Sequence, residues 1–175
     1  MTGFSVGASV LFVALLQVQP ALARSVELAA VCFTPGDDCT GLVVQALDGA
    51  TASVKVQAYT FTSAPIAAAL VAAHRRGVAV RVILDHSQAG QRYSAAGFLS
   101  RAGIEVLIDT APGIAHNKII VIDDARVITG SFNFSASAQR RNVENLVEID
   151  DVETASRFAQ NWASRLPHTY PFVGR

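Results

Sequence analysis

The sequence predicts a layered α/β/α sandwich built on a central mixed β-sheet. Short apolar segments with the period-two pattern of strands alternate along the chain with segments that have the periodicity of amphipathic helices, and this alternation is typical of α/β domains. Around residue 124 two strand patterns are joined by only a few residues. Such a short connection makes a hairpin, so the sheet is expected to contain antiparallel as well as parallel strands.

In the first half of the chain, strands and helices follow one another regularly. The expected elements are strands at 29–33, 54–59 and 78–84 and helices at 41–48 and 64–76. The longer helix has the clearest boundaries, because Pro65 stands at a favourable first helical position and Gly77 follows its last turn.

The second half contains the hairpin. The expected elements are helices at 91–102, near 135 and at 152–166, and strands at 104–108, 116–122, 126–129 and 142–149. Asp123 and Asp124 lie at the hairpin turn, where aspartate is common. No repeat or linker divides residues 24–175, which we interpret as a single domain.

The N-terminal segment has the features of an export signal. Residues 1–23 carry no charge, and an apolar run at 10–16 leads to Ala21-Leu22-Ala23, a small-x-small cleavage pattern. The segment has no basic residue before the apolar run, and an uncleaved membrane anchor is the main alternative. We expect cleavage after Ala23 and a periplasmic or secreted protein without stable membrane association.

Cys32 and Cys39 are the only cysteines, and they are separated by six residues that include Pro35 and Gly36. Such a spacer can turn tightly enough to bring the two sulfur atoms together. In an oxidising compartment we expect them to form a disulfide, whereas in the cytosol they would be free thiols. No histidine or further cysteine completes a zinc-binding pattern around them.

The overall charge does not favour a nucleic-acid partner. The formal net charge is +0, so no general electrostatic field would attract a polyanion. The basic residues are nevertheless unusual, because only Lys55 and Lys118 are lysines and the other basic residues are arginines. Arginine suits bidentate phosphate contacts, but a coding bias would give the same composition.

The chemistry is concentrated between residues 116 and 133. His116 and Lys118 are two apart in a predicted strand, so their side chains project from the same face. Ser131 and Asn133 have the same spacing just beyond the next strand. A neutral imidazole can attack phosphorus to give a covalent phosphohistidine, while the ammonium and amide stabilise the phosphoryl oxygens in the transition state. The second ring nitrogen needs an acceptor, for which Glu144 is the best candidate.

The pattern His116-x-Lys118-x4-Asp123-x6-Gly130-Ser131-x-Asn133 resembles the HKD motif of the phospholipase D superfamily. Further segments resemble the small, single-motif bacterial endonuclease branch, at 33–36, 59–63, 72–78 and 142–145. The resemblance implies that His116 is the nucleophile or its acid/base counterpart. It also implies that Lys118, Ser131 and Asn133 hold the phosphate and that Glu144 orients the imidazole. Asp123 and Gly130 would support the motif structurally.

A single motif implies two chains. In-line displacement at phosphorus requires a nucleophile on one side and a proton donor on the other, yet only His116 among the four histidines has a lysine partner. We therefore expect a homodimer in which a two-fold axis brings two copies of His116 together, as the resemblance also implies. His86, at the end of a predicted strand, is the alternative second histidine.

We expect no metal ion or other cofactor. The acidic pairs 37–38, 123–124 and 150–151 fall at predicted turns and helix starts, where aspartate caps backbone amides. A chelator should then leave activity intact.

The substrate class is expected to be DNA, RNA or both, cleaved without sequence preference. The chain is too short for the extra domains or loops that would form a lipid pocket, and five arginines could flank a groove for the polynucleotide backbone: Arg75, Arg76, Arg92, Arg140 and Arg141. Two alternatives are a phospholipase D-type phosphatidyl hydrolase or transferase and a non-catalytic nucleic-acid-binding member.

Overall fold

A sheet of eight strands is the centre of the fold in residues 25–110 and 113–174, the part of the chain that this computed structural model describes. The strands lie in the order β1-β7-β6-β5-β2-β3-β4-β8. β2, β3 and β4 are parallel, and the remaining neighbours are antiparallel. The strands are β1 Glu27–Thr34, β2 Ser53–Ala58, β3 Ala79–Asp85, β4 Glu105–Asp109, β5 Lys118–Ile122, β6 Arg126–Gly130, β7 Glu144–Asp150 and β8 Thr169–Pro171.

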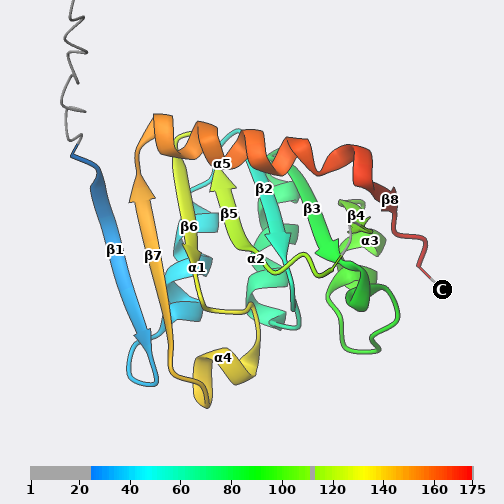
Figure 1. Ribbon diagram of the computed structural model, residues 1–175, viewed down its shortest axis with the longest axis horizontal. Coiled ribbons are helices and arrows are strands. Elements are labelled where there is room, and N and C mark those ends of the chain that lie inside the picture. The colour runs from blue at the N-terminus through cyan, green and yellow to red at the C-terminus, as the bar shows by residue number, and fades with distance from the viewer. Residues whose placement is uncertain (1–24, 111–112, 175) are drawn as a thin grey trace, which may run out of the picture.

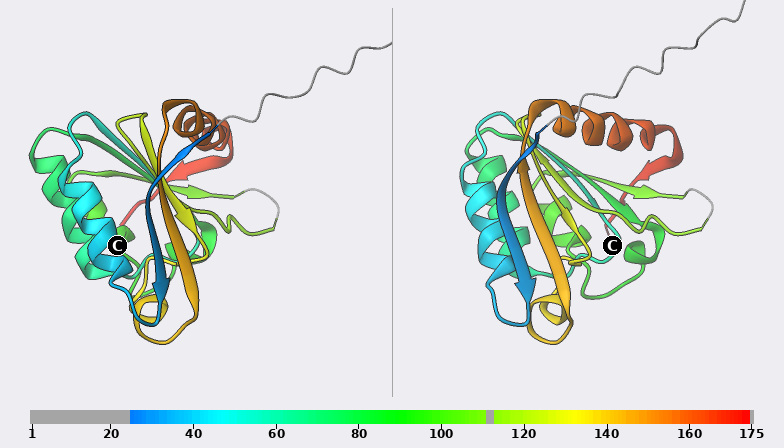
Figure 2. Two further views of the ribbon diagram at one scale, coloured as in Figure 1. Left: turned by 90° about the vertical axis from the view of Figure 1, so that its left-hand side faces the viewer. Right: turned by 60° about the vertical axis from the view of Figure 1, so that its left-hand side comes forward.

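Helices cover both faces of the sheet, as Figures 1 and 2 show. α1 and α2 lie against one face, and α5 crosses the other. The predicted α/β/α sandwich with a mixed sheet is therefore confirmed. The helices are α1 Cys39–Asp48, α2 Ala64–Arg75, α3 Ala96–Arg101, α4 Ala136–Arg140 and α5 Val152–Ser164, with short 3-10 turns η1 His86–Ala89 and η2 Leu166–His168.

The central strand β5 is a continuous apolar run in the sequence, and its position in the sheet explains why. All five of its residues are buried, because each face of the sheet is covered by helices. Ile119 and Val121 pack towards α5, whereas Ile120 and Ile122 belong to the larger core on the α1 and α2 side. On the α5 side, Trp162 is fully enclosed and its indole N–H donates to the Val56 carbonyl at 2.8 Å.

The strand directions bring several chain segments to one edge of the sheet. β2, β3, β4 and β6 end there, while β5 and β7 begin there; Ala58 pairs with Lys118, and Gly130 with Leu146. This edge, called the site edge below, is the lower one in Figure 1. The carboxyl ends of parallel strands are where α/β proteins commonly bind ligands.

The helix predicted at 91–102 is shorter than expected and begins at Ala96. The preceding residues form turns, and the Ala95 amide donates to the carbonyl of Phe61 at 2.8 Å rather than back to its own segment. A tertiary contact has thus overridden the local helical pattern. The structure also adds β8, which was not predicted and which pairs with β4.

Cys32 and Cys39 form a disulfide. The bond links the end of β1 to the first residue of α1, and both residues are buried. The expected pairing is therefore present. It fixes the turn that includes Pro35 and Gly36, in which the Asp37 carboxylate accepts a hydrogen bond from the Phe33 amide at 2.9 Å.

Candidate active site

His116 and Lys118 lie on the same side of the chain at the start of β5. The ring of Tyr59 lies beside both, with its centroid 4.6 Å from the imidazole centroid and 5.2 Å from Lys118 Nζ. Asn117 points to the opposite face, where it lines a hollow with Ile119 and residues of α5. The structure therefore has the alternation that the sequence predicted for this segment.

The imidazole and the ammonium differ in their surroundings. His116 is exposed, whereas only 6% of Lys118 is accessible, and its Nζ donates to the His116 carbonyl at 2.7 Å. Burial lowers the pKa of Lys118, and the charge of Glu144 raises it in part. A partly desolvated cation attracts an anion more strongly than a hydrated one. Lys118 is thus suited to bind an oxygen of a phosphoryl group that reaches His116.

Gly130 allows β6 and β7 to approach closely at the site edge. Its φ is +152°, and a Cβ atom there would lie 2.3 Å from the carbonyl oxygen of Asn145, a contact that backbone atoms cannot relieve without moving. Ser131 follows directly; its Oγ accepts from the Asn145 amide at 3.0 Å and donates to Glu144 at 2.6 Å. The glycine therefore sets the position from which Ser131 projects.

Asn133 has an incompletely paired side chain. Its Oδ1 is buried and, among the described residues, is the only buried side-chain nitrogen or oxygen without a hydrogen-bond partner. Buried polar atoms are normally paired, so an exception beside Ser131 is notable. No described residue donates to this oxygen, so the amide is not held in place through it.

Glu144 is bound to the serine side of the site. Its carboxylate accepts from Ser131 Oγ at 2.6 Å and from Asn142 Nδ2 at 2.8 Å. It also interacts electrostatically with Lys118. No hydrogen bond links Glu144 to His116 within the described part of the chain, so its role in orienting the imidazole stays a prediction.

Asp123 lies at the other end of β5, away from the site edge. Its carboxylate accepts four hydrogen bonds, from the amides of Thr51, Ala52 and Ser53 and from the Thr51 hydroxyl, at 2.8–3.0 Å. Burial alone would raise the pKa of Asp123, but these hydrogen bonds outweigh burial and hold the pKa below its usual value. That Asp123 supports the fold and takes no part in the chemistry stays a prediction.

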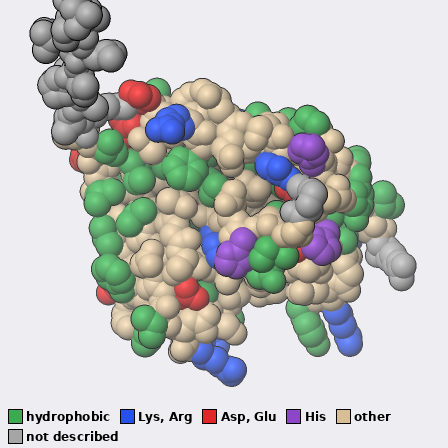
Figure 3. All heavy atoms as spheres, viewed as in Figure 1, with side chains coloured by type: hydrophobic (Ala, Val, Ile, Leu, Met, Phe, Trp, Pro, Cys, Tyr) green, Lys and Arg blue, Asp and Glu red, His purple; other side chains and the backbone are tan. Residues whose placement is uncertain are grey.

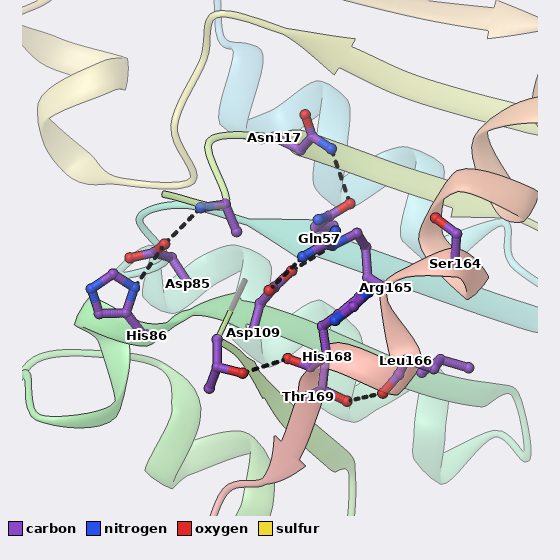
Figure 4. A network of polar contacts seen from close by, with 12 residues as sticks. Gln57, Asp85, His86, Asp109, Asn117, Ser164, Arg165, Leu166, His168 and Thr169 are labelled. Carbon is purple, nitrogen blue, oxygen red and sulfur yellow. Dashed lines mark hydrogen bonds and ion pairs between the residues drawn. The ribbon is translucent and has the colours of Figure 1, made fainter. Parts of the chain in front are cut away.

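Asp85 was not among the predicted site residues, yet it holds the segment that carries His116. This fully buried carboxylate accepts from the Ala115 amide at 2.8 Å and from the Ser87 amide at 3.0 Å. His86 Nδ1 lies 3.5 Å from it, a contact that Figure 4 shows. Burial would raise the pKa of Asp85, but these partners outweigh it and lower the pKa. An aspartate that ends an apolar strand is the sequence signal that could have identified it.

The residue after His116 is anchored as well. Asn117 Nδ2 donates to the Gln57 side chain at 3.1 Å, as Figure 4 shows, and the Asn117 carbonyl accepts from the Tyr59 amide at 3.0 Å. His116 is therefore exposed but carried by a backbone that is fixed on both sides. Such pre-organisation favours a residue that must meet a reacting atom.

The five arginines predicted to flank a groove divide into two groups. Arg92 lies after β3, and Arg140 and Arg141 end α4, all at the site edge. The prediction was wrong for Arg75 and Arg76, which end α2 at the opposite edge because that helix runs back across the sheet. There Arg76 donates to the carbonyl of Leu47 at 2.9 Å.

The acidic pairs act in turns and helix caps. Asp38 caps α1 and Asp151 caps α5 through their side chains, and Asp123 and Asp124 adopt the positive φ values of a hairpin turn. In residues 25–110 and 113–174 no cluster of three or more histidine, cysteine or acidic side chains is arranged to hold a metal ion.

None of the helices in residues 25–110 and 113–174 is long and apolar enough to cross a membrane. Residues 1–23, the predicted signal, lie outside the described residues.

Comparisons with known proteins relate this chain to a described family. Residues 43–166, well over half of the chain, match the family described as "Cardiolipin synthase, PLD-like domain". The chain is 49% identical over 134 residues to a protein of Rickettsia bellii named "Phospholipase D", covering 77% of this chain and 67% of that protein.

Two solved structures share the fold over nearly their whole length. Nuc from Salmonella typhimurium, described as a phospholipase D family member, superimposes with a TM-score of 0.79 and 35% identity, covering 86% of this chain and 99% of Nuc. NucT from Helicobacter pylori gives a TM-score of 0.76 and 27% identity, covering 82% and 98%.

Proposed function

The chain belongs to the phospholipase D superfamily, in the branch of small proteins that includes Nuc, and it is a phosphodiesterase; we propose that it is an endonuclease that cleaves DNA, RNA or both without a metal ion. The observation that carries the proposal is the pairing of an exposed imidazole with a buried ammonium beside Tyr59, at the edge where Ser131 and Asn133 also lie.

The proposed reaction has two displacements at phosphorus. A ring nitrogen of neutral His116 forms a bond to phosphorus, the bond to the leaving oxygen breaks, and a second, protonated histidine gives that oxygen its proton. Water then attacks the phosphohistidine while the second histidine takes up a proton, and the nitrogen–phosphorus bond breaks. Lys118 and Asn133 stabilise the non-bridging oxygens, on which charge increases in both transition states. Ser131 does the same when its hydroxyl turns from Glu144 towards the phosphoryl group.

The second histidine is proposed to be His116 of a sister chain. His86 is less suitable, because it lies against Asp85 on the loop after β3. A two-fold axis through the phosphate would place two identical imidazoles on opposite sides of phosphorus, as in-line displacement requires.

A polynucleotide is the proposed substrate because the chain matches Nuc over nearly all of Nuc's length, at 35% identity. A second candidate, hydrolysis of phosphatidyl groups, is favoured by one observation, the 49% identity to the Rickettsia bellii protein named "Phospholipase D". Since the phosphoryl chemistry would be the same for both, only a comparison of substrates separates them.

The test is to incubate purified protein, in EDTA, with plasmid, single-stranded DNA, RNA and phosphatidylcholine vesicles. We expect cleavage of the polynucleotides, and we expect His116→Ala to remove it. Turnover of phosphatidylcholine alone would favour the second candidate. Nucleic-acid binding without cleavage would indicate a non-catalytic member, and inhibition by EDTA that magnesium reverses would overturn the metal-independent mechanism.

We also propose that the protein is exported to the periplasm or beyond after cleavage behind Ala23. The apolar segment at 10–16 and the Cys32–Cys39 disulfide support this proposal. The intact mass of the protein recovered from a periplasmic extract tests it. A mass that includes residues 1–23 would contradict it.

A further inference from the structure

A groove follows the site edge beyond the catalytic residues. Three hollows of about 510, 250 and 720 Å³ adjoin one another there. The first and second share Thr62, Ser63 and Ala64, and the second and third share Ser94 and Phe98. We call this continuous depression the edge groove. It runs from α4, past the start of α2, to the loop before α3 and the C-terminal segment.

One wall of the edge groove is hydrogen-bonded to the segment that carries Asn133. The amides of Thr62 and Ser63, on its wall, both donate to the carbonyl of Phe134, at 2.9 and 2.8 Å. Phe134 is the neighbour of Asn133, and the segment that leads to Thr62 begins at Tyr59, whose ring contacts the imidazole. The groove wall and the phosphate-binding residues are therefore carried by adjoining segments of the chain.

Positive charge is concentrated in the groove although the protein as a whole is neutral. Arg140 lies at one end and Arg92 and Arg101 at the other. None of these three arginines forms an ion pair with a carboxylate in the described part of the chain, and all are exposed. The one acidic side chain in the lining, Asp38, already caps α1.

Exposed aromatic side chains stand next to these arginines. Tyr93 is 78% exposed, and Phe98 and Tyr170 are each 47% exposed. The Arg92 guanidinium lies 5.7 Å from the centroid of the Tyr93 ring. Figure 3 shows a basic and a hydrophobic side chain that project together from the lower right of the molecule, at the site edge. Large exposed rings beside unpaired arginines are the combination that binds the bases and phosphates of an unpaired strand.

We propose that the edge groove binds a single-stranded polynucleotide, with bases stacked on Tyr93 and Phe98 and phosphates held by Arg92, Arg101 and Arg140. The proposal rests on the proposed nuclease function and specifies its substrate. A duplex is disfavoured, because its bases already stack on one another and present no free face to these rings. The groove is also lined by Gln88, Gln91 and Ser94, which suit a polynucleotide better than lipid chains.

The test measures binding by fluorescence anisotropy in a His116→Ala background, so that no substrate is cut. The probes are labelled single-stranded DNA and RNA of about 20 nucleotides, the matching duplex, and phosphatidylglycerol vesicles. We expect single strands to bind at least about tenfold more tightly than the duplex, and Arg92→Ala with Tyr93→Ala to weaken single-strand binding by about tenfold or more. The DNA and RNA arms show which polymer the groove prefers.

Arg75→Ala is the matched control, since it removes an exposed arginine at the opposite edge, and it should leave the dissociation constant unchanged. Circular dichroism melts check that each variant is folded. The groove proposal would be overturned by equal affinity for duplex and single strand, or by a double substitution that leaves single-strand binding unchanged. A double substitution that weakens vesicle binding and not single-strand binding would overturn it as well. Failure of the nuclease function is separate: the wild-type protein would then cleave none of the polynucleotides.

Discussion

Asp85 shows how a buried carboxylate can act on the active site without touching a substrate. Its bond to the Ala115 amide and the Gln57 bond to Asn117 lie on either side of His116. Loss of either anchor would leave the imidazole in place on average but would widen its range of positions. Because displacement at phosphorus depends on alignment, kcat should respond more than substrate binding.

We therefore predict that Asp85→Asn lowers kcat by about tenfold to a hundredfold and changes KM little. An amide of the same shape keeps an acceptor oxygen but loses the charge that strengthens both amide bonds. Steady-state kinetics with a thermal melt test this prediction. A loss of activity that merely follows the loss of folded protein would contradict a positioning role.

The pKa of Lys118 can be measured directly, because the chain has only two lysines and their signals are easily distinguished. Burial lowers the Lys118 pKa below its usual value of 10.5, and the Glu144 charge opposes that shift. NMR titration of protein with ¹³C-labelled lysine side chains should show Lys118 losing its proton below that value, with Lys55→Arg assigning the two signals. Glu144→Gln should lower the Lys118 pKa further, and an upward movement would show that Glu144 does not support the ammonium.

At the scale of elements, the β5–β6 hairpin is joined to the start of β2 by Asp123. The carboxylate closes the loop at 51–53 against the turn through four hydrogen bonds. β2 and β5 are neighbours in the sheet, and both carry site residues or their anchors at the opposite end. The motif aspartate thus fixes the relative position of two strands from the edge away from the site.

Asp123→Ala should lower the free energy of unfolding by about 2–3 kcal/mol at neutral pH, because three backbone amides lose a charged acceptor. The pKa of Asp123 is lower in the folded chain than its usual 3.8. Its contribution to stability is therefore complete above about pH 4 and is lost as the pH falls through the folded pKa. Urea denaturation at several pH values should show the difference between wild type and variant shrinking in acid.

Asp124→Ala is the control for that experiment. Asp124 occupies the same turn but forms only an exposed ion pair with Lys55 at 2.6 Å, so its removal should cost less than about 1 kcal/mol. Equal losses for the two variants would contradict the distinct structural role of Asp123.

The sequence predicted these elements well wherever apolar periodicity and helix boundaries agreed, as at α2 and β5. It was less successful where a distant contact decides local structure. The turns before α3 depend on the bond from Ala95 to Phe61, and the position of Arg75 depends on the direction in which α2 crosses the sheet. The anchoring by Asp85 joins residues 30 apart in sequence, and no local pattern contains that information.

On the scale of the whole molecule, one motif per chain limits what a monomer can do. The sheet brings His116, Lys118, Ser131 and Asn133 to a single edge, but it supplies no second imidazole with a lysine partner there in the described residues. The motif could be read from the sequence because its spacing follows the strand period. The second half of the proposed site could only be inferred, since it lies on another copy of the chain.

Mixing subunits tests the composite site. If each active site needs two copies of His116, then exchange of wild-type chains with His116→Ala chains should reduce activity as the square of the wild-type fraction. Independent sites would give a linear decrease. The same mixture without subunit exchange serves as the control, and a linear response after complete exchange, verified by mass spectrometry of the mixed dimers, would contradict the two-chain site.

The central claim is that His116 carries the phosphoryl group covalently without a metal ion. The most direct measurement is to quench a reaction with single-stranded oligonucleotide, in EDTA, into alkaline denaturant and to analyse the tryptic peptide 102–118 by mass spectrometry. We predict an acid-labile nucleotide adduct on His116 that forms and decays at rates compatible with turnover. Efficient cleavage with no adduct on this peptide, or with the adduct on another residue such as Ser131, would contradict the account.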